Sequence, residues 1–269
     1  MKLSPTARIG LRTIVLAYLF VLLVLRIAVI LNRTFENGFV AFYHAISTPA
    51  AISALNMSLI IVAIVVPLNV VFGIVTALAL VRGRFPGRGL RQSVVDLPFA
   101  VSPIVVGVSL ILLWGANGWF GGLESTGFKV IFGLPGMVIA TIFVTLPFVV
   151  REVEPVLHEI GEEQEQAAAT LGASKWQTFT RITLPAIRWG LTYGVVLTVA
   201  RALGEFGAVK IVSGNVAQQT QTATLVVEQK YQDFEQGSAY ATSFLLALIA
   251  VAALVVVTIL RPKDSTDGD

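Results

Sequence analysis

Long apolar runs alternate with short polar connections along nearly the whole of this 269-residue sequence. Six runs approach the length of a membrane-spanning helix, at about 11–31, 53–81, 93–114, 133–150, 189–212 and 239–260. A hydrocarbon core of about 30 Å requires roughly 20 apolar residues for one crossing. The pattern predicts an all-α integral membrane protein in which residues 1–269 form a single transmembrane domain with six spans.

The first run occupies the place of a secretory signal, because Lys2, Arg8 and Arg12 precede or begin it. It is longer than the apolar part of such a signal, and the following "NRTFENGFV" contains no small-x-small cleavage site. We therefore expect the run to be retained as the first span.

Composition supports a membrane protein and removes several kinds of chemistry. Hydrophobic residues make up 55 % of the chain and charged residues 13 %, against about 25 % in ordinary soluble domains. The absence of cysteine excludes disulfides, thiolate zinc sites and iron–sulfur clusters. His44 and His158 are far apart and lack ligand spacing, so no metal site is predicted.

The basic residues predict the orientation. With the N-terminus in the cytoplasm, thirteen of the nineteen lysines and arginines fall on the cytoplasmic side: Lys2, Arg8, Arg12, Arg82, Arg84, Arg88, Arg91, Arg151, Lys175, Arg181, Arg188, Arg261 and Lys263. Only Arg33, Lys129 and Lys230 fall in the outer connections. Basic residues concentrate on the cytoplasmic side of membrane proteins. We predict that both termini are cytoplasmic and that the positive net charge requires no nucleic-acid partner.

The connection between the fourth and fifth runs, about residues 152–188, is the longest cytoplasmic segment of this topology. Pro155 suits the first position of a helix, and glutamates near it favour the positive end of the helix dipole. One face of this expected helix carries mainly apolar and small residues together with one glutamine, at Leu157, Ile160, Gln164, Ala167, Ala168 and Leu171, and the acidic residues lie mostly on the other face. Gly172 is placed to end the helix in a left-handed cap.

A second short helix is expected directly after that glycine. Ser174 and Gln177 have the spacing of a capping box, which predicts a helix from about Lys175 to Ile182. The Leu184-Pro185 pair is then expected to close this helix and begin the fifth span. On physical grounds alone, such a segment is equally consistent with an amphipathic linker that lies on anionic lipid.

The spacing within this connection resembles a known signature. Ala167-Ala168, Gly172, Ile182 and Leu184-Pro185 follow the pattern E-A-A-x3-G-x9-I-x-L-P of bacterial ABC importer permeases. In that family the short helix after the glycine is the coupling helix, which docks on a cytoplasmic ATPase. The resemblance implies a type I importer permease fold and places ATPase-coupling residues at Gln166, Ala167, Ala168, Gly172, Ala173, Ser174, Lys175, Trp176, Ile182, Leu184 and Pro185.

The chain departs from the signature at one position. Gln166 stands where the family has glutamate, and Glu165 precedes it. A carboxylate contact with the ATPase is therefore either lost or moved by one residue.

Three further stretches resemble the sulfate and molybdate branch of this family, and most of all its sulfate/thiosulfate permeases. They are "DLPFAVSPIVVG" at 96–107, "GLPGMVIATIFVTLPFVVREVEPVL" at 133–157 and "RALGEFGAV" at 201–209. The resemblance implies a permease subunit that translocates sulfate, and with it thiosulfate, by alternating access. The alternatives are a molybdate or tungstate permease, and a membrane scaffold that recruits a cytoplasmic protein.

The same resemblance implies the partners. They are a dimer of ATPase subunits that uses ATP and Mg, a second and related permease chain, an extracytoplasmic sulfate-binding protein and the lipid bilayer of the bacterial inner membrane. The binding protein is expected to meet the connections at 32–52, 115–132 and 213–238. No cofactor is expected on this chain.

Catalytic motifs are absent from the sequence. It contains no G-x-x-x-x-G-K-[ST] phosphate loop, and "GRFPGRG" at 83–89 is interpreted as a cytoplasmic turn. No Ser/His/Asp set and no pair of intramembrane carboxylates suggests a reaction. We therefore expect the chain not to be an enzyme, with the energy supplied by the ATPase.

Arg201 and Glu205 are the charged residues of most interest, because an ion within the membrane costs at least about 2.5 kcal/mol and is functional by default. Their spacing of four allows them to pair on one helix face. The pair either braces the bundle or lines a polar path for an anion. Lys210 is expected to be an interfacial anchor, and Asp96 a cap for the third span.

Small residues and prolines mark other positions in the spans. Ala200, Gly204 and Ala208 recur every four residues, as do Gly190 and Gly194, which predicts close helix packing. Prolines and a glycine are expected to kink or weaken the second and third spans, at Pro67, Pro98, Pro103 and Gly107. Such kinks are either tolerated irregularities or hinges.

Overall fold

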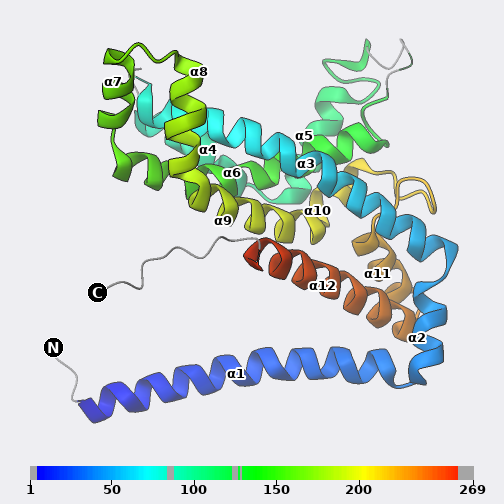
Figure 1. Ribbon diagram of the computed structural model, residues 1–269. Helices are drawn as coiled ribbons and strands as arrows, with labels where there is room; N and C mark the ends of the chain where they lie inside the picture. Colours follow the sequence, from blue (N-terminus) through cyan, green and yellow to red (C-terminus); the bar gives the residue numbers. More distant parts are fainter. Residues whose placement is uncertain (1–4, 84–87, 123–126, 128, 260–269) are drawn as a thin grey trace.

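The protein is described by a computed structural model that covers residues 5–83, 88–122, 127 and 129–259 (Figure 1). In these ranges the regular structure is entirely helical. Among the described residues, five helices are long and apolar enough to cross a membrane, and a bent pair of helices accounts for a sixth crossing if it is counted as one span. The predicted fold class is confirmed. Lys2, Arg84, Arg261 and Lys263, used above to predict orientation, lie outside the described residues, as does most of the "GRFPGRG" turn.

The helices follow one another along the chain, with the bounds α1 (Pro5–Phe35), α2 (Gly38–Ile46), α3 (Pro49–Arg82), α4 (Arg88–Ala100), α5 (Pro103–Trp114), α6 (Leu134–Ile160), α7 (Glu163–Thr170), α8 (Lys175–Thr178), the π-helical segment η2 (Phe179–Thr183), α9 (Leu184–Leu203), α10 (Gly207–Val212), α11 (Ala223–Gln232) and α12 (Gln236–Ile259).

The centre of the fold is the packing of α3, α6 and α9 against one another. Glycines permit the close approach: a Cβ at Gly73 would lie 2.5 Å from a methyl group of Val149, and one at Gly194 would lie 2.9 Å from the Val149 Cα. At Gly190 a Cβ would collide with the Glu152 carbonyl oxygen. The predicted close packing at Gly190 and Gly194 is confirmed, and the partner helix is α6.

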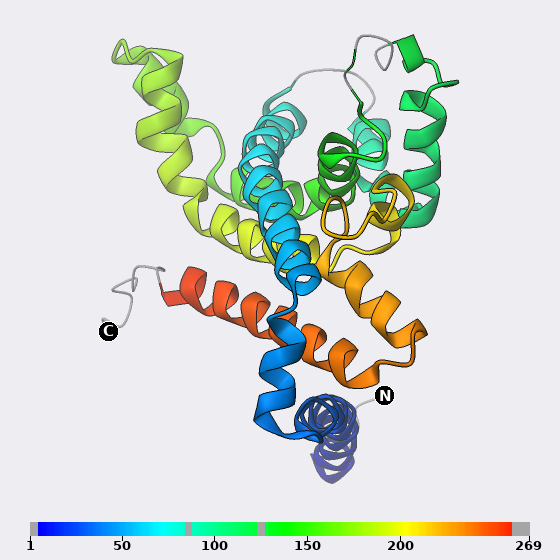
Figure 2. The ribbon, with the colours of Figure 1, turned by 90° about the vertical axis from the view of Figure 1, so that its right-hand side faces the viewer.

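α1 stands beside this centre rather than within it. It contacts α12 and α2, and Figure 2 shows it almost end-on, on the far side of α12 from α3, α6 and α9. Phe35 at its end meets the rings of Phe39, Phe42 and Phe244, with centroids 5.2–6.2 Å away. The start of α1, the end of α12 and the α7–α8 corner lie toward the same end of the molecule (Figure 1).

The third predicted span is broken. Its residues are divided between α4 and α5, and the chain bends by 108° between these two helices. Pro98 lies inside α4, and Pro103 begins α5 after Ser102 has taken an extended conformation. Because proline lacks a backbone N–H and clashes with the preceding turn, the two prolines favour a break between them. The predicted disruption by these prolines is confirmed. Pro67 is accommodated within the continuous α3.

The boundaries of the fourth span and of the following helix were predicted wrongly. α6 continues to Ile160, so Pro155 lies inside it and does not begin the next helix. Val153 and Leu157 are fully buried, which keeps this last part of α6 against α3 and α9. Tertiary packing therefore outweighs the proline signal. The expected apolar face is consequently divided between α6 and α7, and Leu171 is 89 % exposed.

The fifth predicted span, residues 189–212, is also wrong in its bounds. One continuous helical stretch runs from Lys175 to Leu203, and the chain breaks at Gly204 before α10. Ala200, Gly204 and Ala208 therefore do not share a helix face. Gly204 is exposed, and a Cβ there would meet only ordinary contacts with the Ala200 and Arg201 carbonyl oxygens. The break allows α10 to pack on α5, where the Gly107 position lies against Ala208 and Ile211.

Candidate functional site

The corner between α7 and α8 has the predicted conformation. Gly172 has φ +85°, in the left-handed region that glycine adopts without strain. The Ala173 N–H donates to the Ala168 carbonyl at 3.0 Å. In the capping box, the Ser174 hydroxyl accepts from the Gln177 N–H at 3.3 Å, while the Gln177 side chain accepts from the Ser174 N–H at 2.9 Å. Local hydrogen bonds therefore fix the direction of the second helix.

The second helix does not end where the sequence predicted. α8 passes into η2, and η2 passes directly into α9, so Leu184 and Pro185 interrupt nothing. The Leu184 N–H donates to the Phe179 carbonyl, five residues earlier. Pro185 has no N–H to donate, and in a regular α-helix its ring would clash with the carbonyl four residues before it. The wider π turn accommodates both the missing hydrogen bond and the bulk of the ring. The short helix and α9 thus form one rod.

The predicted coupling residues divide between an exposed surface and a packed base. Gln166, Ala167, Gly172, Ser174, Lys175, Trp176 and Pro185 are exposed, whereas Ala168, Ala173, Ile182 and Leu184 are half-buried. Trp176 is 70 % exposed and its ring lies 5.7 Å from that of Phe179. Leu184 packs against the cluster of buried residues around Ile187. The tip of the corner therefore exposes a large aromatic ring and a cation at the surface.

The two residues at the departure from the signature have different environments. Gln166 is exposed, and its Nε2 lies 3.4 Å from Glu162 Oε2. The Glu165 carboxylate instead contacts Arg82 at the end of α3, 3.3 Å from its Nε, and accepts a 2.8 Å hydrogen bond from Thr183. Arg82 and Thr183 were not predicted as members of this site, because they lie 83 and 18 residues from Glu165. No local pattern reveals such pairings.

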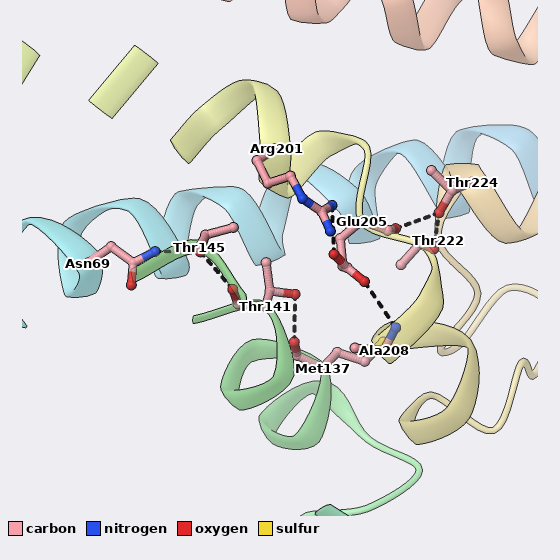
Figure 3. A network of polar contacts seen from close by, with 9 residues as sticks. All are labelled: Asn69, Met137, Thr141, Thr145, Arg201, Glu205, Ala208, Thr222 and Thr224. Atoms are coloured by element: carbon pink, nitrogen blue, oxygen red, sulfur yellow. Dashed lines mark hydrogen bonds and ion pairs between the residues drawn. The ribbon is translucent and has the colours of Figure 1, made fainter. Parts of the chain in front are cut away.

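Arg201 and Glu205 are brought together, as expected, but not on one helix face. Arg201 Nη1 lies 2.7 Å from Glu205 Oε2, and Glu205 follows the end of α9 (Figure 3). Glu205 Oε1 accepts from the Ala208 N–H at 2.9 Å, and the Glu205 carbonyl accepts from Thr224 at 2.9 Å. The Glu205 side chain is 1 % exposed and that of Arg201 is 32 % exposed. Glu205 thus links the break between α9 and α10 to Arg201 through its side chain and to α11 through its carbonyl.

A second buried polar cluster was not predicted. Asn69 of α3 donates to the Thr145 hydroxyl of α6 at 2.5 Å, and Thr145 and Thr141 each donate to a carbonyl one turn earlier (Figure 3). Asn69, Thr141 and Thr145 are 0 % exposed. In an apolar environment such bonds join helices, because an unpaired polar group is unfavourable there. The only sequence signal was polar residues inside apolar runs.

The expectation for Asp96 was wrong, and the expectation for Lys210 was incomplete. Asp96 lies inside α4, and its carboxylate binds Arg151 of α6 at 2.8 Å instead of capping a helix. Lys210 lies close to Glu228 of α11 as an ion pair, so it is more than an interfacial anchor. Both partners lie on other helices, out of reach of sequence spacing.

A cavity of about 600 Å³ lies between α9, α11 and α12. Most of its walls are apolar, with Leu203, Val227 and Leu246 among them, and Arg201 does not line it. Within the described ranges, no group of three or more His, Asp or Glu residues is arranged to hold a metal ion. None of the described residues that line the cavity is a lysine or an arginine, so its wall offers no positive charge to attract a dianion.

Residues 69–263 match the family described as binding-protein-dependent transport system inner membrane component. The chain belongs to this family. It is 50 % identical over 249 residues to the sulfate transport system permease protein CysW of Synechocystis sp., covering 92 % of this chain and 90 % of that one. It is 34 % identical over 249 residues to CysT of Escherichia coli K12, also a sulfate transport system permease protein, covering 92 % and 90 %.

A solved structure has the same fold. A chain of a bacterial alginate ABC transporter, in complex with an alginate pentasaccharide-bound periplasmic protein, superimposes with a TM-score of 0.78 at 17 % identity. The superposition covers 96 % of each chain. The architecture is therefore that of an ABC importer permease.

Proposed function

We propose that this chain is a permease subunit of an ATP-driven importer that carries sulfate, and thiosulfate with it, into the cytoplasm. The observation that carries the proposal is the α7–glycine–α8 corner, which exposes Trp176 and Lys175 at the end of a rod that continues through α9. The choice of sulfate rests on the similarity to CysW over 92 % of the chain.

The rod suggests how the importer is driven. Two ATPase subunits seat the α8 helices of two permease chains, and ATP binding draws the ATPases together. Because α8, η2 and α9 are continuous, a shift of the corner displaces α9 within the bundle. ATP binding thereby favours an outward-open state and hydrolysis returns the inward-open state, which is alternating access by differential stabilisation.

The partners follow from this arrangement. The chain pairs with a related permease, for which the similarity to CysT as well as CysW gives a precedent of two distinct chains. The α7–α8 corner, the start of α1 and the end of α12 share one end of the molecule, which supports cytoplasmic termini in the inner membrane (Figure 1). An extracytoplasmic binding protein then meets the opposite end, where α2 and α11 lie.

Glu205 is assigned a bracing role and not a place on the sulfate path. Its carboxylate is occupied by Arg201 and by the Ala208 N–H, and it is almost wholly buried. A self-neutralised pair is a poor trap for an anion, and transport requires sites from which the anion readily leaves. The chain itself performs no reaction, and the ATPase supplies the energy.

The test is uptake of labelled sulfate by cells that lack this gene, with and without its restoration. Restored uptake that excess thiosulfate blocks and excess molybdate leaves nearly unchanged supports the proposal. Uptake that molybdate blocks would move the substrate to molybdate or tungstate. Unchanged uptake, together with no ATPase co-purifying with the chain, would favour a membrane scaffold and overturn the proposal.

A further inference from the structure

Arg82, the last residue of α3, reaches the corner between α6 and α7. Its Nη2 donates to the Gly161 carbonyl at 2.5 Å, and its Nε lies 3.3 Å from Glu165 Oε2. Gly161 has φ +62° and ψ −163°, a combination restricted almost entirely to glycine. One guanidinium therefore holds both sides of this turn, with the Arg82 side chain only 18 % exposed.

The same carboxylate continues the link into the next element. Glu165 Oε1 accepts a hydrogen bond from the Thr183 hydroxyl at 2.8 Å. Thr183 lies in η2 and is 3 % exposed. Arg82, Glu165 and Thr183 thus form a chain of contacts from the end of α3, through α7, to the junction of the short helix with α9.

α7 is otherwise weakly held. None of its residues is buried, and a cavity of about 350 Å³ lies beside it, lined in part by Glu165, Ala169, Ala173 and Phe179. It contacts α8 and η2, and it lies close to the end of α3 (Figure 1). A partly buried, charge-assisted contact is then a substantial part of what fixes its position.

We propose that Arg82, Glu165 and Thr183 form a clasp that makes the coupling corner move α3 together with α9. This inference rests on the proposed transport function and assigns the three as positioning residues. It also accounts for the departure from the family signature: the carboxylate at position 165 serves inside the chain, while Gln166 occupies the exposed position. Without the clasp, movement of α8 would be taken up by displacement of α7 across the adjacent cavity.

The first measurement is hydrogen exchange on the purified full chain in lipid nanodiscs. Arg82→Gln and Glu165→Gln are expected to raise exchange of the α7 and η2 amides about tenfold, because local opening no longer breaks an ion pair. Exchange in α6 and α9 should remain as before. Glu163→Gln is the matched control, since Glu163 is exposed on the same helix and its change removes the same charge.

The second measurement is the ratio of sulfate transported to ATP hydrolysed by the complete importer in proteoliposomes. The two variants are expected to assemble in normal yield and to lower this ratio about tenfold, with basal ATP hydrolysis within about twofold of the original. The charge exchange Arg82→Glu with Glu165→Arg should recover part of the ratio, although it removes the donor to Gly161. Thr183→Val should lower the ratio less than either charge change.

Each outcome either supports or overturns the clasp. Increased exchange with a lowered ratio, and partial recovery in the exchanged pair, supports the clasp. Unchanged exchange overturns it, and so does increased exchange with a normal ratio, which would make the contacts only structural. The unaltered importer is measured first: if it takes up no sulfate with ATP, the proposed function fails, independently of the comparison of exchange among variants.

Discussion

The rod from Lys175 to Leu203 has an arginine–glutamate pair near each end, and the two pairs are built differently. Near α8, Arg82 and Glu165 come from distant segments and remain partly exposed, at 18 % and 22 %. Near α10, Arg201 and Glu205 are four residues apart, and the Glu205 side chain is 1 % exposed. The first pair joins elements that must move together, whereas the second stabilises a local break. Burial predicts which of them matters more for folding.

Glu205→Ala should have the largest effect on stability. It leaves Arg201 without its counter-ion and the Ala208 N–H without its acceptor. Breaking such a pair costs about 3 kcal/mol or more, so the folded yield should fall severalfold. The measurement is detergent size-exclusion yield and thermal midpoint. Glu205→Gln, which keeps an acceptor for Ala208, should lose less. Normal yield of Glu205→Ala with reduced sulfate uptake would reverse the bracing assignment in favour of the path.

Gly190→Ala and Gly204→Ala compare a packed position within the rod with the open position directly after its end. A methyl group at Gly190 would collide with the Glu152 carbonyl, so α6 and α9 must separate. At Gly204 the nearest contact is 3.6 Å, and φ is −91°. We expect a loss of about 2 kcal/mol for the first and a change near zero for the second, read from thermal unfolding. Equal losses of stability would mean that the close approach of α6 and α9 at Gly190 does not restrict the size of the side chain there.

Gly172→Val acts on the corner itself. Its φ of +85° disfavours a β-branched residue by about 1–2 kcal/mol, although a Cβ there meets nothing within 4 Å. Because the penalty is confined to the exposed corner, folded yield should hold while ATP hydrolysis is uncoupled from sulfate uptake. Gly172→Asn is the control, since asparagine tolerates this conformation. Coupled transport by Gly172→Val would contradict a fixed corner.

The sequence predicted those features that depend on neighbouring residues. Apolar runs identified the long helices, and Gly172 with Ser174 and Gln177 specified the corner and its capping box. These signals are local, because a cap or a left-handed turn is decided within about four residues. The fold class and the exposed short helix after Gly172 could be predicted on this basis.

The features that were predicted wrongly or not predicted depend on contacts between distant segments. Pro155 suggested a helix start, yet buried Leu157 holds α6 together beyond it. The π segment relieves the crowding at Pro185, so the expected end of the short helix does not occur. Arg82 is one of many basic residues until α3 places it beside Glu165. Hydrophobic periodicity carries no information about such partners.

Asp96→Asn should have the smallest effect of these changes. Asp96 and Arg151 lie 2.8 Å apart, closer than the 3.3 Å of Arg82 and Glu165, but their side chains are 34 % and 52 % exposed. Water and salt screen such a pair, and Arg151 keeps its position over the Phe99 ring without it. We expect a loss below about 0.5 kcal/mol, seen as a nearly unchanged thermal midpoint. A loss as large as that of Glu205→Ala would show that distance, and not burial with additional hydrogen bonds, sets the strength of these ion pairs.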